Sequence, residues 1–424
     1  MKFLVLGLAV VMYGLVIAFP HKKAWFTLVA AAAVTALGVV SPAQVFGELI
    51  NWNVLLIYVG SLVIADLFIY SRVPSMVADR IVEKAPTLGW GVVFILIMTG
   101  LLSAFVENVA TVLVMAPIAL ALSDKMKVDA RYFMMGLAVM SNLQGTATLV
   151  GDPPSMIFAG FAGYSFNDFF FVDGRLSVFF AVQVGMLVGA AYFYWFYRKL
   201  GKSKVDLPDT SVLSWVPTLL LVFLILGLAA ISFLFEGFSI LSGGFVFALG
   251  LVGLLWYVFV RKESPGEAWR LVKGLDWETI LFLVGIFVVV GAVSETGLLT
   301  DLSRALGNFV DGNVFLGFTV IVLISVILSG FIDNVPYIIV MLPVAAALSA
   351  NLGLRPELYM FGLLIGSCLG GNLTPFGASA NVVAVGLLRK RGTVVRFGEW
   401  IRVAGPFTVL TTLASSIFLW VVWR

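Results

Sequence analysis

The chain contains one cysteine, Cys368, and one histidine, His21, among its 424 residues. A single cysteine excludes an internal disulfide and a thiolate metal cage, and a single histidine excludes a histidine-based metal centre or proton relay. A Ser-His-Asp set is also improbable, because His21 falls in an expected loop. We therefore expect no enzyme activity, no metal site and no cofactor other than a coupling ion.

Charged residues are scarce as well, at 12% of the chain against 61% hydrophobic residues, and the mean hydropathy is +1.08. A soluble globular protein is about half apolar and a quarter charged. The composition predicts an all-α, multi-pass protein of the plasma membrane. The net charge of +3 does not indicate a nucleic-acid partner. Because no nucleotide-binding motif is present, ATP drive would need a separate ATPase subunit.

Two stretches of the chain repeat each other at an offset of 226 residues. Residues 103–123 (SAFVENVATVLVMAPIALALS) and 329–349 (SGFIDNVPYIIVMLPVAAALS) are identical at eleven of 21 aligned positions. The same offset aligns residues 145–160 with residues 371–386. Each copy has an acid beside an asparagine in one apolar run, and Gly, Thr or Pro in the next. Duplicated halves with interrupted apolar helices are typical of secondary transporters.

A membrane crossing requires roughly 20 apolar residues. We interpret ten runs as crossings, two of them interrupted: 3–19, 24–41, 51–70, 132–163 (interrupted), 176–197, 213–235, 239–260, 277–297, 358–388 (interrupted) and 401–423. The first run is read as a retained helix, because Pro20-His21-Lys22-Lys23 follows it in place of a small-residue cleavage site.

Two further apolar regions, residues 90–122 and 315–349, are broken in the middle by an acid and an asparagine. Each half is short for a crossing, so we predict re-entrant hairpins that enter and leave on one side. Irregular backbone is tolerated at that depth only where protein or a wet cavity surrounds it. The alternative is two full crossings per region. It would place each loop on the same side of the membrane as the hairpin topology does, so it is left open.

The basic residues support this topology. With the N-terminus outside, the inner loops hold 21 of the 26 Lys and Arg residues, including Lys22 and Lys23. This arrangement places no basic residue at the depth of the hairpin tips. The amphipathic stretches 72–84 and 299–309 are expected to lie along the two membrane interfaces.

The predicted domains follow from this topology. They are a first repeat of residues 1–197 with hairpin 90–122 opening to the cytoplasm, a cytoplasmic linker of residues 198–212, and a second, inverted repeat of residues 213–424 with hairpin 315–349 opening to the outside.

Four acids fall within the apolar segments: Asp66, Glu107, Asp152 and Asp333. Ionisable groups inside a membrane are costly and are usually functional. Without a basic partner each must be protonated, bind a cation or cap a helix. We expect Glu107, Asp152 and Asp333 to couple transport to H⁺ or Na⁺. For the tip asparagines, helix capping alone is the alternative.

The interrupted helices carry glycine and proline, which leave free backbone groups along the gap. A half-helix N-terminus offers partial positive charge to an oxyanion or a polarised hydroxyl. A simple packing kink is the alternative. The predicted substrate-binding residues are Asn108, Thr146, Thr148, Asn334, Thr374, Ser379 and Asn381.

The strings SAFVENVATVLVMAP with GTATLVGDPP, and SGFIDNVPYIIVMLP with GGNLTPFGASANVV, resemble the ion transporter superfamily. The similarity is to the branch of ArsB-type arsenite permeases, NhaD-type sodium/proton antiporters and the melanosomal P protein, and it spans almost the whole chain. It implies inverted repeats, two hairpins, two discontinuous helices, a transport domain moving against a scaffold as an elevator, and a homodimer.

The tips depart from those of sodium-coupled dicarboxylate relatives, which carry Ser-Asn-Thr. Here they read Glu107-Asn108-Val109 and Asp333-Asn334-Val335, and Ser155 replaces a common asparagine after the double proline. Carboxylates without a basic residue would repel a polyanion. We therefore expect proton-coupled efflux, by antiport, of arsenite, antimonite or a similar neutral metalloid hydroxide. Sodium/proton antiport is the alternative. A cation-coupled carboxylate or anion symporter and a channel-like conduit fit the residues less well.

Overall fold

The computed structural model describes residues 2–126, 128–200, 210–235 and 240–424. These residues are almost entirely helical, apart from the short antiparallel pair β1 (Phe171–Val172) and β2 (Arg175–Leu176). Within the described residues, eight helices are long and apolar enough to cross a membrane. The protein is therefore all-α and polytopic, as its composition predicts.

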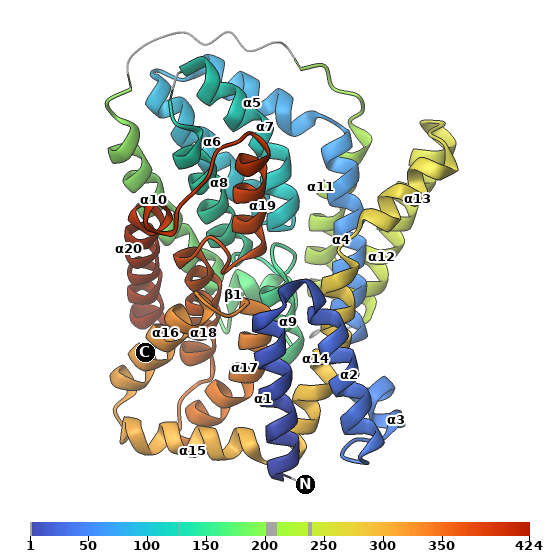
Figure 1. The fold of residues 1–424 in the computed structure, drawn as a ribbon, viewed down its shortest axis with the longest axis vertical. Coiled ribbons are helices and arrows are strands. Elements are labelled where there is room, and N and C mark those ends of the chain that lie inside the picture. Colours follow the sequence, from blue (N-terminus) through green and yellow to red (C-terminus); the bar gives the residue numbers. More distant parts are fainter. Residues whose placement is uncertain (1, 127, 201–209, 236–239) are drawn as a thin grey trace.

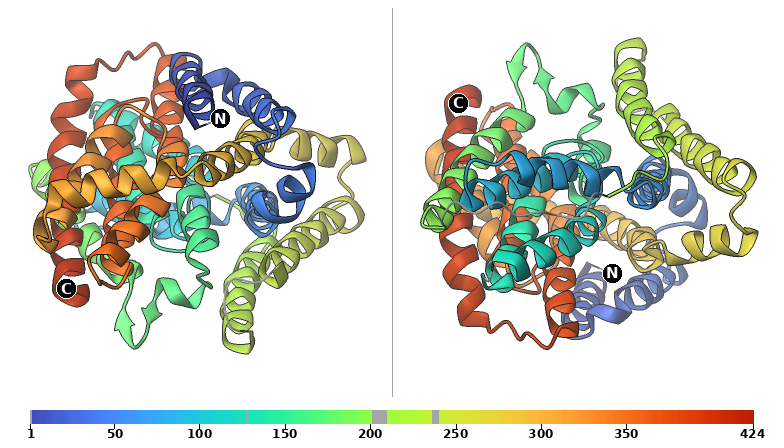
Figure 2. Two further views of the ribbon diagram at one scale, coloured as in Figure 1. Left: turned by 90° about the horizontal axis from the view of Figure 1, so that it is seen from below. Right: turned by 90° about the horizontal axis from the view of Figure 1, so that it is seen from above.

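One set of helices, the scaffold group, stands at one side of the molecule (Figure 2). In it α4 packs along α12, and α2 packs along α14. Its members are α1 (Lys2–Ala18), α2 (Lys23–Ala36), α3 (Pro42–Gln44), α4 (Trp52–Tyr70), α11 (Val216–Leu234), α12 (Ile240–Leu255), α13 (Pro265–Gly274) and α14 (Trp277–Glu295). Glycine allows the closest approaches, since a Cβ on Gly60 of α4 would lie 2.5 Å from the carbonyl oxygen of Val246.

The other set, the hairpin group, contains the large buried aromatic side chains Phe133, Phe361, Trp400 and Phe407. In it α10 packs along α20, α6 and α7 pack on α8, and α16 and α17 pack on α18. Its members are α6 (Leu88–Ser103), α7 (Asn108–Met126), α8 (Ala130–Gly145), α9 (Pro153–Ala162), α10 (Val178–Tyr197), α16 (Val314–Ser329), α17 (Asn334–Asn351), α18 (Glu357–Gly370), α19 (Ser379–Lys390) and α20 (Phe397–Trp423).

The helix pairs α6–α7 and α16–α17 enter the molecule from opposite ends (Figure 1). Helix α5 (Val73–Lys84) lies across the upper end immediately before the first pair, and α15 (Leu298–Val310) lies across the lower end before the second. The two predicted amphipathic stretches are therefore helices, and we call α5 the upper arm and α15 the lower arm. The two predicted interruptions are also present, between α8 and α9 and between α18 and α19.

The same hydrogen bonds recur in the two halves at the offset of 226. The Thr148 hydroxyl donates to the carbonyl of Ala104, and the Thr374 hydroxyl donates to the carbonyl of Gly330. A Cβ on Gly151 would lie 2.5 Å from one carbonyl oxygen and 2.7 Å from another. Its counterpart Gly377 is enclosed in the same way, at 2.6 and 2.8 Å. The sequence repeat thus builds the same tight crossing of a helix break over a hairpin twice.

Helices α1 and α2 do not run from end to end. α1 rises from the N-terminus at the lower end, and α2 returns toward that end (Figure 1). The Lys2 ammonium pairs with Asp301 of the lower arm, while the Tyr13 hydroxyl donates to the carbonyl of Pro336, 3.3 Å away, at the tip of the second hairpin. The junction of α1 and α2 therefore lies at the depth of that tip.

The prediction of full crossings at 3–19 and 24–41, joined by an inner loop with Lys22 and Lys23, was wrong. The two apolar helices have 17 and 14 residues. Hydropathy alone does not separate two short crossings from a pair of helices that turns back inside the protein. The orientation of the later helices is unchanged, because either arrangement returns the chain to the end where it began.

The polar stretch after α12, expected as a loop, contains α13 and leads to Asp276, whose carboxylate accepts from the Tyr58 hydroxyl at 3.3 Å. Of the predicted linker 198–212, residues 201–209 lie outside the described residues. Arg131 pairs with both Asp129 and Glu399 and so joins the start of α8 to α20. This hydrogen-bonded guanidinium holds the pKa of Asp129 below its usual value.

The contact between α4 and α12 gives a prediction about stability. Gly60→Ala places a Cβ 2.5 Å from the Val246 carbonyl oxygen and should lower the free energy of unfolding by about 1–3 kcal/mol. Thermal unfolding of the purified protein in detergent measures this change. The control is Gly244→Ala on α12, where a Cβ would meet nothing within 4 Å. Equal melting temperatures for the two variants would contradict the packing described.

Candidate functional site

A small polar cavity lies where the scaffold group meets the hairpin group. Its volume of about 20 Å³ accommodates roughly one water molecule. The scaffold group contributes Lys23, Tyr58, Asp276 and Thr279, and the hairpin group contributes Glu107, Asn108, Asp152, Pro153, Asp333, Asn334, Val335 and Ser379. The cavity is therefore a boundary site that neither group forms alone.

Four half-helices begin at this cavity: α7, α9, α17 and α19. Their free N–H groups give the site partial positive charge. Three of these helices follow an acid of the chain itself. Glu107 accepts from the N–H of Ala110 at 3.0 Å, and Asp333 accepts from the N–H of Val335 at 3.1 Å. Helix α19 follows Ala378 instead, and its exposed first residue, Ser379, lines the cavity.

Asp152 is the third of these acids and differs from the other two. It occupies the N-cap position of α9, but its side chain makes no capping hydrogen bond. Only 3% of the residue is exposed, and its Oδ2 has no hydrogen-bond partner within the described part of the chain. A buried carboxylate without a partner is costly. This oxygen is therefore available to accept a proton, a cation or a hydrogen bond from the hydroxyl of a solute.

Lys23 lies in the site, although its sequence context predicts an inner loop. Its Nζ is 3.2 Å from Oδ2 of Asp333, and the two side chains are 12% and 31% exposed. The expectation that no basic residue reaches the depth of the acids was wrong. Because Lys23 belongs to the scaffold group and Asp333 to the hairpin group, this ion pair joins the two groups across the cavity.

Sequence reasoning also missed Tyr58, Asp276 and Thr279. The Asp276 carboxylate caps α14 by accepting from the N–H of Thr279 at 3.0 Å, and it accepts from the Tyr58 hydroxyl. Asp276 precedes a predicted crossing and resembles an ordinary residue of a basic loop. Conversely, Asp66, singled out as an acid in an apolar run, does not line the cavity.

Buried amides hold the half-helices together behind the cavity. The Asn142 amide donates to Oδ1 of Asn372 at 2.8 Å and to Oδ1 of Asn381 at 2.9 Å, and it accepts from Asn108 at 3.2 Å. The Asn381 amide donates to the carbonyls of Gly371 and Thr374 at 2.9 and 2.8 Å. This network joins α7 and α8 to the break between α18 and α19, and thus the first half of the chain to the second.

The predicted substrate-binding residues therefore fall into two sets. Those that line the cavity are Asn108, Asn334 and Ser379, together with the predicted coupling acids Glu107, Asp152 and Asp333. Those that are buried behind it are Thr146, Thr148, Thr374 and Asn381, whose side chains hydrogen-bond to backbone carbonyls. Within the described residues, no three His, Cys, Asp or Glu side chains are grouped so as to hold a metal ion.

A wider cavity of about 560 Å³ lies between the same two groups, toward the lower end. Its lining includes Ile157 and Ile339, each one helical turn beyond Pro153 or Val335 of the small cavity. Asn53 lines it near the lower end of α4, below Tyr58. The wider cavity therefore comes within one helical turn of the small cavity on its lower side.

Comparison with known families places these features among transporters. The family model described as "Citrate transporter" (CitMHS) matches residues 13–366. An uncharacterized transporter of Mycobacterium tuberculosis is 30% identical over 414 residues, which cover 96% of each chain. The P protein of Sus scrofa is 23% identical, over 94% of this chain and 57% of its own length.

Two solved structures share the fold. The YdaH transporter of Alcanivorax borkumensis gives a TM-score of 0.63 at 16% identity, over 94% of this chain and 96% of its own. MtrF of Neisseria gonorrhoeae, described as illuminating a class of antimetabolite efflux pumps, gives 0.51 at 14% identity, over 92% of this chain and 83% of its own. At these identities the likeness concerns the fold alone.

The ion pair across the cavity yields a prediction. Lys23→Met leaves Asp333 without its cation and should destabilise the protein by about 1–3 kcal/mol, between the values for exposed and fully buried pairs. The double variant Lys23→Met/Asp333→Asn should recover most of this loss. Melting temperatures in detergent complete the cycle. The matched control is Arg270→Met/Glu267→Gln, an exposed pair on α13 that should change little. Strictly additive effects of the two cavity substitutions would disprove the coupling.

Proposed function

The chain belongs to the citrate transporter family, within the ion transporter superfamily that its repeated motifs resemble, and from this premise we propose a proton-coupled antiporter. In this proposal the transporter expels arsenite, antimonite or a similar small neutral hydroxide. The observation that carries it is the buried carboxylate oxygen of Asp152, which has no hydrogen-bond partner among the described residues and lies in a cavity that three other described acids line.

The charge of the site argues against a polyanionic cargo. Of the described residues that line the cavity, four carry a carboxylate and one carries an ammonium, which already pairs with Asp333. The partial positive charge of α7 and α17 is met by Glu107 and Asp333. A tricarboxylate such as citrate, after which the family is named, would therefore meet repulsion unless several cations entered with it.

A neutral hydroxide suits the available partners better. Its O–H groups would donate to the free oxygen of Asp152. Its oxygens would accept from the amide of Asn334 or from the open N-terminus of α19 at Ser379. Arsenous acid is uncharged near neutral pH and crosses the site without the cost of burying a net charge. The cavity would have to widen to admit it, which relative movement of the two groups would provide.

Proton coupling would follow from competition at the same acid. When a proton occupies Asp152, its oxygen no longer accepts from the cargo, and when the cargo leaves, the buried carboxylate regains a need for a proton. The pair between Lys23 and Asp333 would break when the hairpin group moves against the scaffold group in an elevator manner. Each conformational step would thus change the charge exposed at the boundary.

Sodium/proton antiport is the second candidate, and the size of the cavity favours it. A volume of about 20 Å³ suits a single dehydrated cation more readily than a larger solute. Oxygens of Asp152, Glu107 and Asn108 would then serve as ligands. A neutral hydroxide and sodium make different demands on the acids, so transport measurements separate them.

Proteoliposomes with an imposed pH gradient test the proposal. We expect uptake of arsenite or antimonite that accelerates with the gradient and saturates, with no transport of citrate or succinate. Sodium-driven proton movement without arsenite flux would favour the second candidate. Citrate flux without arsenite flux and without sodium-driven proton movement would overturn both candidate functions.

Asp152→Asn tests the role of the unpartnered acid. The amide keeps the size of the side chain but loses the exchangeable proton, so the acceleration by the pH gradient should vanish while the protein remains folded. Rates of coupled uptake in proteoliposomes provide the measurement. Asp124→Asn, which removes an exposed acid paired with Arg391, is the matched control and should transport normally. Normal pH-driven uptake by Asp152→Asn would refute the assignment.

A further inference from the structure

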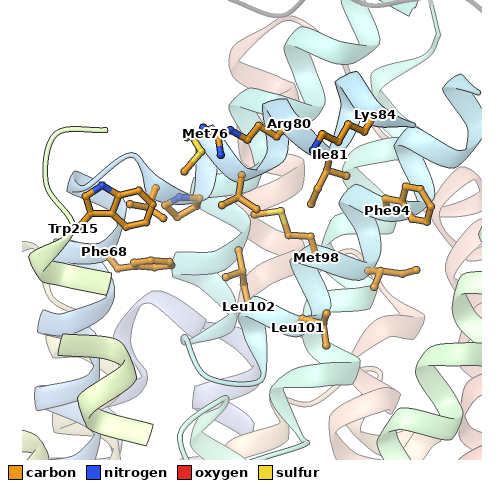
Figure 3. Close-up of a pocket in the computed structure, with 14 residues that line it drawn as sticks. Phe68, Met76, Arg80, Ile81, Lys84, Phe94, Met98, Leu101, Leu102 and Trp215 are labelled. Carbon is orange, nitrogen blue, oxygen red and sulfur yellow. The ribbon is translucent and has the colours of Figure 1, made fainter. Parts of the chain in front are cut away.

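A large apolar groove lies under the upper arm α5, away from the central cavity. Its volume is about 880 Å³, with a wall formed by α5 and a floor formed by α6 (Figure 3). The lining side chains are Phe68, Val73, Pro74, Met76, Val77, Arg80, Ile81, Lys84, Phe94, Ile97, Met98, Leu101, Leu102 and Trp215. Twelve of these fourteen residues are uncharged and apolar, so the floor alone would accept any hydrocarbon.

Among the described residues that line the groove, the two charged ones, Arg80 and Lys84, are both basic. Arg80 and Lys84 are four residues apart on α5 and therefore lie on one face of that helix, along the rim (Figure 3). Both are exposed. Neither appears in an ion pair within the described residues. The acids of the same helix, Asp79 and Glu83, do not line the groove.

The groove also lies at a suitable depth. α5 crosses the upper end of the molecule, where the apolar helices end (Figure 1). Trp215, which is 55% exposed, flanks the rim, and tryptophan is enriched where acyl chains meet headgroups. The expected topology places this end on the cytoplasmic side, where the leaflet carries anionic lipids.

We propose that this groove binds one anionic glycerophospholipid of the surrounding bilayer, with an acyl chain along α6 and the phosphate against Arg80 and Lys84. The positive rim over an apolar floor is the complement of such a molecule. A zwitterionic lipid would bring a cation to a rim that is already positive.

A second apolar groove gives an internal comparison. It has a volume of about 320 Å³ and lies between α16 and α20, where Phe315, Leu323, Val409 and Trp420 are among its lining residues. None of the described residues that line this groove is charged. It is therefore suited to bulk acyl chains or another apolar surface, and it provides no reason to prefer an anionic headgroup.

Occupancy of the α5 groove would bear on transport. Leu101 and Leu102 line its floor, and the carbonyl of Leu102 accepts from the N–H of Val106 at 2.8 Å, directly before Glu107. A lipid seated there would contact the arm and the first hairpin together. It would thus resist their separation as the hairpin group moves.

Native mass spectrometry of the full chain tests the proposal. Protein purified in detergent with equal amounts of phosphatidylglycerol and phosphatidylcholine should retain one phosphatidylglycerol in preference. The expected preference is about 25-fold, at about fivefold for each basic side chain near the phosphate. The double variant Arg80→Gln/Lys84→Gln should lose this preference for phosphatidylglycerol. Arg389→Gln/Lys390→Gln removes the same two charges from exposed positions on α19 and should keep it.

A second variant tests the groove without changing charge. Leu101 is 47% exposed, so Leu101→Trp should fold and fill the floor, and it should retain less phosphatidylglycerol than the wild type. The proposal fails if the wild type shows no preference, or if the two double variants behave alike. It also fails if the dominant species is a dimer that Leu101→Trp dissociates, which would make a second copy of the chain the occupant.

Discussion

The structure depends on one constraint, which is that four helices begin inside the protein at membrane depth and their backbone groups must be satisfied there. Neither lipid nor bulk water can provide those hydrogen bonds at this depth. The chain provides them with the amide of Asn381, with the hydroxyls of Thr148 and Thr374, and with carboxylates at two of the four helix starts, Glu107 and Asp333. The way in which these backbone groups are hydrogen-bonded explains the fold of the hairpin group. It also explains the position of the cavity and the charge of the site.

The same constraint explains why the candidate site lies between two bodies. The half-helices complete one another within the hairpin group, so their exposed starts face outward against α2, α4 and α14. Lys23 and Asp276 then bring charge from the scaffold group to that face. Movement of one group past the other would expose or cover the acids without disturbing the amide network. A lipid between α5 and α6 would act on this movement at its edge, because that arm connects the two groups.

Much of the architecture was predictable from the residues because the relevant signals are local or repeated. An acid and asparagine inside an apolar run, found twice at one offset, predicted both hairpins, and Gly, Thr and Pro predicted both helix breaks. The residues of the site were predicted less completely. Lys23 and Asp276 belong to stretches that hydropathy assigns to loops, and Tyr58 is one aromatic among many in apolar helices. Only contacts between distant segments bring these three residues to the cavity.

By itself, the sequence determined the class of the protein, its duplicated halves and the acids at its hairpin tips. These depend on composition, periodicity and neighbouring residues. The tertiary structure decided which of the conspicuous polar residues face the cavity and which support the backbone. It also decided that α1 and α2 turn back at the depth of the second hairpin, so that a lysine meets Asp333. The reason is physical: burial and pairing of a charge depend on packing between segments hundreds of residues apart, which local pattern does not encode.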